Sequence, residues 1–483
     1  MKILHITPEL APWSKAGGLG DATIALCKAL AAQGHEVRVV TPLYGSVPGR
    51  ENMGTRLEVL KVGVHGNPAK AACRVRSLAI CSGLEAWFIE HEDYYGGREI
   101  YPTREDVGER AAFYGRAALD ICLNTGWTPD IIHVHDWTAG LVPVLLNTVV
   151  KGTPLGKCAS VMTIHNLQHQ GLMSRRVMGF LGLPEHLWSP LELECLGGLN
   201  FLKGGILHAT RVITVSPTYA REILTPEFGY GLDDVVRRRQ PELEGILNGV
   251  DNDEWNPSTD PHLKKNYSAK DLGGKSACKA ELQHELGLAI EVKIPLVGVI
   301  SRLWEQKGLD LAVRVLPKFL RAGQMQFVLL GSGDAQLENE FRRLATDFPE
   351  LCAVRIGYDN GLSHRIEAGA DFFLMPSRFE PCGLNQLYSM AYGTLPIVRA
   401  TGGLADTVKH WSRTTAQGTG IVFQHADVSG IDWAIQQALE LFARPADFQS
   451  VQVQAMQQEF SWAKSADRHL SCYRKALTQR LAG

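Results

Sequence analysis

The sequence predicts an α/β protein with two domains, each built on a parallel sheet with helices packed against it. Short β-branched runs alternate with longer helical patterns along the whole chain, which is typical of parallel strands joined by right-handed crossovers. The chain has 483 residues, which is too long for one ordinary core. Its apolar pattern is interrupted near the middle by a polar stretch, where we expect one domain to end and the other to begin.

Five strands are expected in the first half, each a short run of largely β-branched or apolar residues. They lie at residues 2–7, 37–42, 131–135, 160–165 and 211–216. After the first of them, Ala22, Leu26, Ala29 and Leu30 form the apolar face of a helix, which Gly34 ends.

The domain crossover is expected near residue 246, because Asn248 to Asp251 is a turn signal and the residues from there to Gly287 are polar with few apolar repeats. Five further strands are expected beyond it, at residues 294–303, 326–331, 370–376, 395–400 and 420–423. In the tail from Ser465, apolar residues recur at helical spacing with basic residues on the other side, so this amphipathic helix must pack on another part of the protein. The apolar positions are Leu470, Tyr473, Leu477 and Leu481.

Composition and charge narrow the class of protein. A hydrophobic content of 45% is that of a globular enzyme, and a net charge of −2 gives no electrostatic case for binding nucleic acid or a membrane surface. The ten cysteines are spread singly, without C-x-x-C or zinc spacing, which predicts reduced thiols in a cytoplasmic protein. The N-terminus reads directly as a first strand without a signal-peptide layout, and no apolar run approaches the length of a membrane span.

The segment from Ser377 to Leu384 carries the strongest functional signal. It follows the apolar run of the strand at 370–376 and precedes a helical pattern that Gly393 ends. Glu380 and Gly383 therefore place a carboxylate and bare backbone N–H groups where a parallel strand turns into a helix, and open α/β sheets bind ligands at that end of their strands. A carboxylate there can accept hydrogen bonds from sugar hydroxyls.

Three glycine-rich or basic loops also follow strands. In the loop from Lys15 to Asp21, glycines let backbone N–H groups approach an anion and Lys15 adds a positive charge, although a tight turn explains the glycines equally well. Arg302 and Lys307, after the first strand of the second half, either converge on a diphosphate or form salt bridges within their loop. The Gly-Gly loop at 401–406 either offers further N–H groups to phosphates or is only a tight turn.

Histidines mark the ends of two strands in the first half. His133 and His135 share one face of their strand, because side chains alternate along it. They either form a metal pair or, since no further ligands are apparent, are hydrogen-bonded residues beside Asp136, which is the more functional candidate. His165 and Asn166 end the next strand and either offer donors and acceptors to sugar hydroxyls or form a structural turn.

Together these motifs resemble those of bacterial glycogen synthases and plant starch synthases, which are retaining glycosyltransferases. The resemblance runs from Ile3 to the final helix and implies the GT-B architecture, in which two Rossmann-like domains have parallel sheets facing a central cleft. It is carried by Lys15-x-Gly-Gly-Leu, His133-x-His135-Asp136-Trp137, His165-Asn166-Leu167, Val215 to Ala220, Asn248 to Asp251, Ser301-Arg302-Leu303, Gln306-Lys307-Gly308, Ser377 to Leu384 and Thr401 to Asp406.

The resemblance implies domain limits and a reaction. Residues 1–245 would form the acceptor-side domain, completed by a closing helix at 460–483, and residues 246–459 the nucleotide-sugar-side domain. The reaction would transfer glucose from ADP-glucose to the non-reducing 4-OH of an α-1,4-glucan, such as glycogen or a malto-oligosaccharide, with retention of configuration and release of ADP. Neither a metal nor a cofactor is expected.

The family's functional positions map onto individual residues of this sequence. Arg302 and Lys307 match the pair that holds the diphosphate, Glu380 lies in the segment that holds the glucose, and Tyr358 looks like the tyrosine that lies against the base. The positions implied as catalytic are Glu380, His165, Asp136, Arg302 and Lys307. Those implied to bind substrate are Lys15, Gly18, Asp21, Asn166, Asn248, Tyr358, Cys382, Gly383, Leu384, Asn385, Thr401, Gly402 and Gly403.

Two positions depart from the family's pattern, because Ala16 and Asn385 stand where a Thr is frequent. Many related transferases carry a second Glu eight positions after the first, and Tyr388 stands there in this chain, as in other synthases of this type. Glu380 therefore acts without that partner. Glu380 and Asp136 are the candidate carboxylates and are expected on different domains, so the sequence does not give their spacing. Our hypothesis is that no covalent glucosyl-enzyme forms and that the leaving phosphate assists the acceptor on the same face.

Rival functions are another two-Rossmann sugar enzyme, such as a glucan phosphorylase or a sucrose- or trehalose-type transferase, and a catalytically silent glucan-binding or scaffold protein. A phosphorylase would need a lysine site for pyridoxal phosphate, and no stretch suggests one. A dinucleotide-dependent oxidoreductase is disfavoured because the first glycine-rich turn lacks the G-x-G-x-x-G pattern. The sequence does not separate ADP-glucose from UDP-glucose, and it leaves open whether the chain forms a homo-oligomer.

Overall fold

The structure is a computed structural model that describes residues 1–97 and 99–482. These residues form two compact units. The first contains Met1–Gly249 and the closing helix α18 (Trp462–Ala482), and the second contains Val250–Ser461. Both changeovers lie a few residues further along the chain than the expected limits at 245–246 and 459–460.

The first unit is built on one large sheet. Its strands are β1 (Lys2–Ile6), β2 (Glu36–Pro42), β3 (Gly54–Lys61), β4 (Ala72–Cys81), β5 (Leu84–Glu90), β6 (Ile131–His135), β7 (Ala159–Ile164), β11 (Arg211–Thr214) and β12 (Leu243–Gly245). Among the described residues they pair in the order β12-β11-β7-β6-β1-β2-β5-β4-β3. The pairs from β12 through to β5 are parallel, as the alternating strand and helix pattern predicts.

An antiparallel extension was not among the five strands expected here. The pairs β3–β4 and β4–β5 are antiparallel and lie at one edge of the sheet. Strand β3 has one buried residue, Leu60, among its eight. Without a buried face it has no strong apolar alternation, and that alternation is the main sequence signal for a strand.

Helices and a second, small sheet complete the first unit. The small sheet pairs β8 (Leu172–Met173) and β9 (Glu194–Cys195) with β10 (Gly198–Asn200). The α-helices before the closing one are α1 (Gly18–Ala32), α2 (Glu92–Tyr95), α3 (Val107–Thr125), α4 (Val142–Asn147), α5 (Arg176–Leu181), α6 (Phe201–His208), α7 (Pro217–Glu222), α8 (Pro226–Gly229) and α9 (Asp233–Arg238). Short 3-10 turns are η1 (Arg50–Asn52), η2 (Pro68–Lys70), η3 (Trp137–Ala139), η4 (Pro154–Lys157), η5 (Glu185–Leu187) and η6 (Gln240–Glu242).

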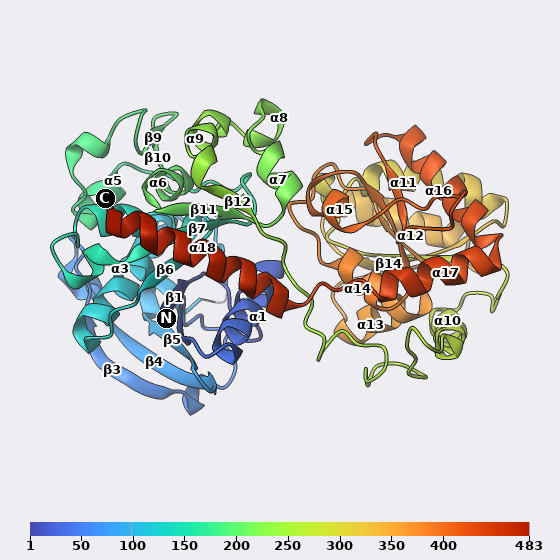
Figure 1. The fold of residues 1–483 in the computed structure, drawn as a ribbon, viewed down its shortest axis with the longest axis horizontal. Helices are drawn as coiled ribbons and strands as arrows, with labels where there is room; N and C mark the ends of the chain where they lie inside the picture. Colours follow the sequence, from blue (N-terminus) through green and yellow to red (C-terminus); the bar gives the residue numbers. More distant parts are fainter. Residues whose placement is uncertain (98, 483) are drawn as a thin grey trace. The chain divides into compact units, whose positions relative to one another are not determined.

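Helix α18 returns to the first unit and packs beside α1 and β7, where Figure 1 shows it in red. Leu470 and Tyr473 on its apolar face are buried, and the Tyr473 hydroxyl lies 2.7 Å from His133 Nδ1. The last residue of the expected apolar stripe, Leu481, is instead 88% exposed, because the helix outruns the surface that it covers.

The second unit has one parallel sheet covered by helices. Its strands are β13 (Leu296–Ile300), β14 (Gln326–Gly331), β15 (Cys352–Ile356), β16 (Phe372–Met375), β17 (Leu395–Arg399) and β18 (Ile421–Phe423), paired in the order β15-β14-β13-β16-β17-β18. Its helices are α10 (Gly273–Leu286), η7 (Glu305–Lys307), α11 (Leu309–Arg321), α12 (Ala335–Asp347), α13 (Asn360–Gly369), α14 (Asn385–Ala391), α15 (Gly402–Thr407), α16 (Val428–Phe442) and α17 (Pro445–Met456). Apolar side chains from the sheet and these helices form a continuous core.

Two elements of the second unit differ from expectation. The first strand ends at Ile300 and not at residue 303, so Arg302 lies in the following loop. Helix α10 occupies part of the polar stretch in which no element was expected, because its apolar face is narrow and its mean composition is polar. Both differences place more of the chain in loops and helices around the sheet.

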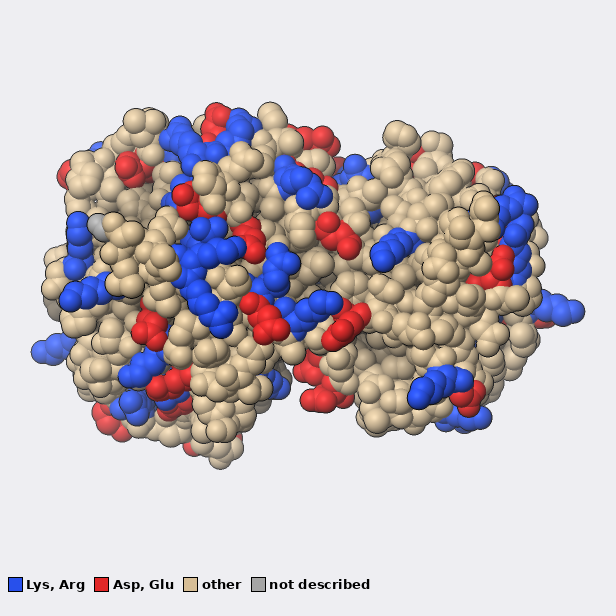
Figure 2. All heavy atoms as spheres, viewed as in Figure 1, with Lys and Arg blue, Asp and Glu red and all other residues tan. Residues whose placement is uncertain are grey.

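The surface carries both signs of charge in close alternation. Figure 2 shows basic side chains gathered over α18 with acidic ones among them, and Glu244 pairs there with both Arg468 and Lys475. Among the described residues, no helix is both long enough and apolar enough to cross a membrane.

Candidate active site

In the second unit, the predicted residues lie on loops at the carboxyl ends of neighbouring parallel strands. The loops follow β13, β16 and β17, which are adjacent in the sheet. That edge is where open α/β sheets bind ligands, because helix N-termini and free backbone groups converge there. The remaining residues predicted on these loops, besides those described next, are Cys382, Leu384 and Thr401.

Lys307 and Glu380 form an ion pair on these loops. Lys307 Nζ lies 2.6 Å from Glu380 Oε2, and the hydroxyl of Ser377 donates to the same oxygen at 3.0 Å. The side chain of Lys307 is 20% exposed and that of Glu380 is 8% exposed, so water screens the pair less than it would on the surface. Gly308 makes the close approach possible, because its φ is +65° and a Cβ there would lie 2.1 Å from the carbonyl oxygen of Pro376.

Gly402 and Gly403, the first two residues of α15, let the start of that helix pack directly against the backbone that carries Glu380. A Cβ on Gly402 would lie 2.0 Å from the carbonyl oxygen of Glu380, and one on Gly403 would lie 2.0 Å from that of Cys382. The N–H of Gly403 donates to the carbonyl oxygens of Glu380 and Pro381, at 3.1 Å each. This N–H is therefore used within the protein, as in the tight-turn alternative for this motif, and Gly403 permits close packing.

Two supports of the Glu380 loop lie outside the predicted set. The guanidinium of Arg378 donates to both carboxylate oxygens of Asp310, at 2.7 and 2.8 Å. The amide of Gln386 donates to the carbonyl oxygens of Cys382 and Gly383, at 3.0 and 3.1 Å. Gln386 is fully buried, but it lies away from the apolar face expected for this helix, which runs through Leu384, Leu387 and Ala391, so the sequence pattern does not point to it.

Three other predicted residues of this unit are not gathered around the ion pair. Arg302 is exposed and has no hydrogen-bond or ion-pair partner for its side chain among the described residues, so it does not share the contact of Lys307. Tyr358 follows β15, two strands away from β13, and is 77% exposed. The amide of Asn385 donates to the carbonyl oxygen of Ile300 at 2.7 Å, so it supports the loop and is not free for a ligand here.

In the first unit, Asp136 organises the ends of β6 and β7. Its φ is +54°, a left-handed value that costs a non-glycine residue about 1–3 kcal/mol and that often marks functional sites. Its Oδ1 accepts hydrogen bonds from the backbone N–H groups of His165 at 2.7 Å and Asn166 at 3.4 Å. Burial raises the pKa of Asp136 to about 7, although these two bonds act in the opposite direction.

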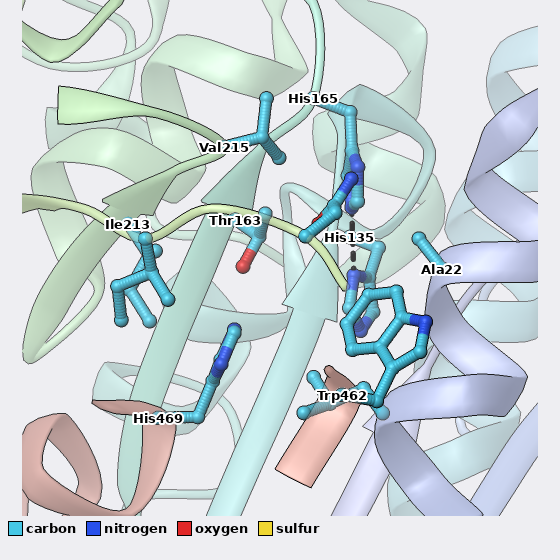
Figure 3. Close-up of a pocket in the computed structure, with 11 residues that line it drawn as sticks. Ala22, His135, Thr163, His165, Ile213, Val215, Trp462 and His469 are labelled. Carbon is cyan, nitrogen blue, oxygen red and sulfur yellow. Dashed lines mark hydrogen bonds between the residues drawn. The ribbon is translucent and has the colours of Figure 1, made fainter. Parts of the chain in front are cut away.

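A small cavity lies beside these residues, and Figure 3 shows the side chains around it. Its volume is about 10 Å³, which is room for one water molecule and not for a sugar. His165 and Asn248 line it, whereas Asn166 turns its Oδ1 to the backbone N–H of Gln168, at 3.0 Å. The Asn166 side chain thus caps its own turn, which was the structural alternative for this motif.

The histidines of this region use their ring nitrogens on one another and on nearby hydroxyls. His135 Nδ1 lies 3.0 Å from His165 Nε2, and His135 Nε2 lies 3.0 Å from Nδ1 of His5. Both nitrogens of His133 are also engaged, with Thr163 Oγ1 at 2.5 Å and Tyr473 Oη at 2.7 Å. Ring nitrogens of His5, His133 and His135 lie within 4.8 Å of one another, but a metal ion there would have to replace several of these bonds.

The glycine-rich loop of the first unit is anchored by an acidic residue that was not predicted. Glu9 Oε2 accepts from the backbone N–H groups of Ala16 at 2.7 Å and Gly17 at 2.9 Å, and Glu9 Oε1 accepts from the Tyr101 hydroxyl at 2.7 Å. The loop is therefore fixed in place, and Gly18 opens α1 with an N–H that has no partner within that helix.

Lys15 lies at the rim of an open pocket. Its Nζ is 2.8 Å from Asp21 Oδ2, and both side chains are partly exposed. The pocket has a volume of about 630 Å³, within the range of ligand-binding clefts. It is lined by Pro12, Trp13, Ser14, Lys15, Ala16, Ser46, Pro48, Glu99, Ile100 and Tyr101.

Comparison with known proteins identifies both units. The family described as starch synthase catalytic domain matches residues 2–238, and the family described as glycosyl transferases group 1 matches residues 287–450. A glycogen synthase of Anaeromyxobacter sp. (strain Fw109-5) is 47% identical, with 98% of this chain and 99% of the relative covered. Glycogen synthase 1 of Geobacter sulfurreducens is 43% identical, covering 100% of this chain and 97% of the relative.

Solved structures agree with this assignment. The catalytic domain of starch synthase IV from Arabidopsis thaliana, bound to ADP and acarbose, superposes with a TM-score of 0.91 at 34% identity, covering 99% of both chains. A sucrose-phosphate synthase from Thermosynechococcus elongatus has a TM-score of 0.62 at 19% identity, covering 99% of this chain and 100% of the other, and shows a shared fold alone.

Proposed function

This chain belongs to the glycogen and starch synthase family of glycosyltransferases, and from that premise we propose that it transfers glucose from ADP-glucose to an α-1,4-glucan. The new bond would form at the non-reducing 4-OH, with retention of configuration and release of ADP. The observation that carries the proposal is the Lys307–Glu380 pair at the carboxyl ends of β13 and β16. It lies in a chain that glycogen synthases match over nearly its whole length.

The donor assignment follows from charge and from the relatives. Breaking the bond between glucose and phosphate builds negative charge on the departing nucleoside diphosphate. Lys307 and the exposed Arg302 would stabilise that charge in the second unit, and the N–H of Gly18 at the start of α1 would do so in the first. ADP in place of another nucleotide is supported by the Arabidopsis starch synthase, whose structure is bound to ADP.

For the chemical step, we propose attack on the face from which the diphosphate leaves. The bond between C1 and the phosphate oxygen breaks with its electron pair remaining on ADP, and the acceptor 4-oxygen bonds to C1. The acceptor proton passes to the departing phosphate. Glu380 would hold the glucose through its carboxylate, and Asp136 and His165 would lie around the reacting sugar; accumulation of a glucosylated side chain in the wild-type enzyme would contradict this scheme.

We further propose that the reaction needs neither a metal ion nor a cofactor, since cationic side chains supply the charge that the leaving group requires. Full activity after exhaustive chelation is expected, and activity that chelation abolishes and Mg²⁺ restores would overturn this part.

The free thiols of the ten cysteines support the proposal that the protein acts in the cytoplasm.

The decisive experiment measures nucleoside diphosphate release from ADP-glucose and, separately, from UDP-glucose, each with and without glycogen. Glycogen-dependent release of ADP is the expected result. A preference for UDP-glucose would keep the family and the fold but correct the donor. No release from either donor, with glucan binding intact, would favour a silent binding protein.

A further inference from the structure

His165 is the outer end of a chain of three histidines that runs into the interior of the first unit. Its Nε2 lies 3.0 Å from Nδ1 of His135, a bond drawn in Figure 3, and Nε2 of His135 lies 3.0 Å from Nδ1 of His5. The three residues come from or directly follow β7, β6 and β1, which are neighbours in the sheet. The chain therefore rests on three adjacent, buried strands.

The protons of these three hydrogen-bonded histidines can be placed in two ways. A neutral imidazole carries one N–H and one lone pair, so each link needs a donor on one side and an acceptor on the other. If the N–H groups point inwards, His165 is protonated on Nε2 and His5 carries its proton on Nε2. If they point outwards, His5 and His135 are both protonated on Nδ1, and His165 carries its proton on Nδ1.

The inner end of the chain selects between these arrangements. His5 Nε2 is buried and has no hydrogen-bond partner among the described residues. The inward arrangement would leave a buried N–H donor without an acceptor. Among backbone groups, orphaned buried N–H donors are rarer than under-satisfied acceptors, and we extend that preference to the imidazole. The outward arrangement leaves only a lone pair unsatisfied, so we take the outward one.

The rings are neutral, as this counting requires. Burial lowers the pKa of His5 and of His165 to about 3, and it lowers that of His135 well below the usual value. His133 packs against the rings of His5 and His135, and Tyr473 and His469 in turn pack against His133. The carboxylate of Asp136 lies beside His165 and accepts a hydrogen bond from its backbone N–H and not from its ring. The imidazole of His165 therefore remains available to bond with His135.

We propose that His135 and His5 are positioning residues that hold His165 in its Nδ1–H tautomer, so that His165 presents an N–H donor to the hydroxyl groups of the sugar substrate. Nδ1 is the ring nitrogen of His165 outside the chain, and it has no partner among the described residues. The part of this inference that concerns the sugar rests on the proposed function, whereas the tautomer itself does not.

His133 provides a matched control. It lies on the same strand as His135, is equally buried, and its ring stacks on that of His135 with centroids 4.4 Å apart. It belongs to a different set of bonds, however, with Thr163 and Tyr473 as partners. If replacing any buried histidine lowered kcat, His133→Leu would lower it as well. A loss of kcat that depends on the His165–His135–His5 hydrogen bonds would not appear in His133→Leu.

The first measurement is the tautomer of His165 by NMR of protein labelled with ¹⁵N-histidine, with the resonances assigned from the His165→Ala variant. Protonation on Nδ1 is expected in the wild-type protein, and the His135→Leu variant should shift His165 towards the Nε2–H form. A wild-type His165 protonated on Nε2 would overturn the proposal, whatever the activity of any variant.

The second measurement is kcat for two substitutions at position 135. The amide nitrogen of an asparagine can take the place of Nδ1 and donate to His165, whereas leucine cannot. His135→Leu should lose about 10- to 100-fold in kcat, approaching the loss typical of removing one aligned donor, while His135→Asn and His133→Leu should stay near the wild-type value. Equal kcat in His135→Leu and His135→Asn would overturn the positioning role.

The two proposals can fail separately. Full activity in His165→Ala would remove His165 from the reaction and so contradict its assigned role in the proposed function. The tautomer measured in the wild-type protein would still decide whether His5 and His135 orient it. If His135→Leu does not fold, the wild-type tautomer and the rescue by asparagine still test the chain.

Discussion

Replacing Gly403 by alanine is expected to displace the loop that carries Glu380 while leaving the second unit folded. The new Cβ would lie 2.0 Å from the carbonyl oxygen of Cys382 and 2.6 Å from its carbonyl carbon, although such contacts essentially never occur below 3.0 Å. The neighbouring atoms are backbone and have no flexible end that can turn away. The loop must therefore shift by roughly 1 Å, as the added atom is overpacked against it.

That shift should act on turnover more than on stability. Overpacking of this kind costs roughly 1–3 kcal/mol, which is less than the stability of most domains. Glu380 lies two residues from the clash, and its bond to Lys307 is only 2.6 Å long, so a shift of the loop misaligns both. A misplacement of about 1 Å can cost on the order of 10²-fold in rate, and we expect a loss of that size in kcat.

The assay is ADP release in the presence of glycogen, with kcat and KM measured separately and thermal unfolding measured in parallel. Gly179→Ala is the control, because Gly179 is in helix α5 and, apart from its chain neighbours and the nearby backbone of that helix, nothing lies within 4 Å of a Cβ there. Alanine is favoured over glycine in a helix by up to about 1 kcal/mol, so this variant should melt slightly higher with unchanged kcat. A Gly403→Ala enzyme as fast as the wild type would refute the reasoning.

Three further predictions follow from single contacts. Glu380→Gln should lose about 10²–10³-fold in kcat, because it removes one preorganised charge beside Lys307. Its melting temperature should be nearly unchanged. Unchanged turnover would exclude the role assigned to Glu380. Because burial raises the pKa of Asp136 to about 7 from an unfolded value of about 4, the folded state binds its proton more tightly in that window. The unfolding free energy of the wild type should thus fall relative to Asp136→Asn as pH rises from 4 to 7, and a constant difference in denaturant titrations would contradict the raised pKa. Tyr473→Phe should lower the unfolding free energy by about 1–3 kcal/mol with unchanged kcat, because it leaves His133 Nδ1 unpaired in the core. An unchanged midpoint of denaturant unfolding would show that this hydrogen bond adds little stability.

Much of the sheet architecture could be read from the sequence because buried parallel strands are continuous apolar runs. The expected strands at 131–135 and 326–331 have the same limits in the structure. The hairpin of β3 and β4 was not predicted, because most of β3 is exposed and its sequence lacks the alternation of apolar and polar residues. Sequence patterns report burial, and they are weakest where a strand lies at an exposed edge of its sheet.

The predicted site differs from the observed one in its contacts more than in its residues. Lys307 and Glu380 form an ion pair although they are 73 positions apart in the sequence. Tyr101 donates a hydrogen bond to Glu9, which is 92 positions away. No local pattern encodes such partners, because they depend on how separate loops pack. The same holds for Gly403, whose N–H is used by the loop that it supports.

Tyr388 explains why Glu380 has no second carboxylate beside it in this chain. Many related transferases carry a Glu at this position, but here the Tyr388 ring stacks on Trp255 with centroids 4.0 Å apart and planes within 4° of parallel. Trp255 stacks in the same way on His364, so position 388 anchors the segment that follows the domain crossover. A tyrosine at position 388 supplies no carboxylate, so this position places no second acidic side chain beside Glu380. Negative charge in the Glu380 loop therefore rests on one carboxylate, which Lys307 already neutralises, and such a carboxylate is better suited to holding a sugar than to attacking it.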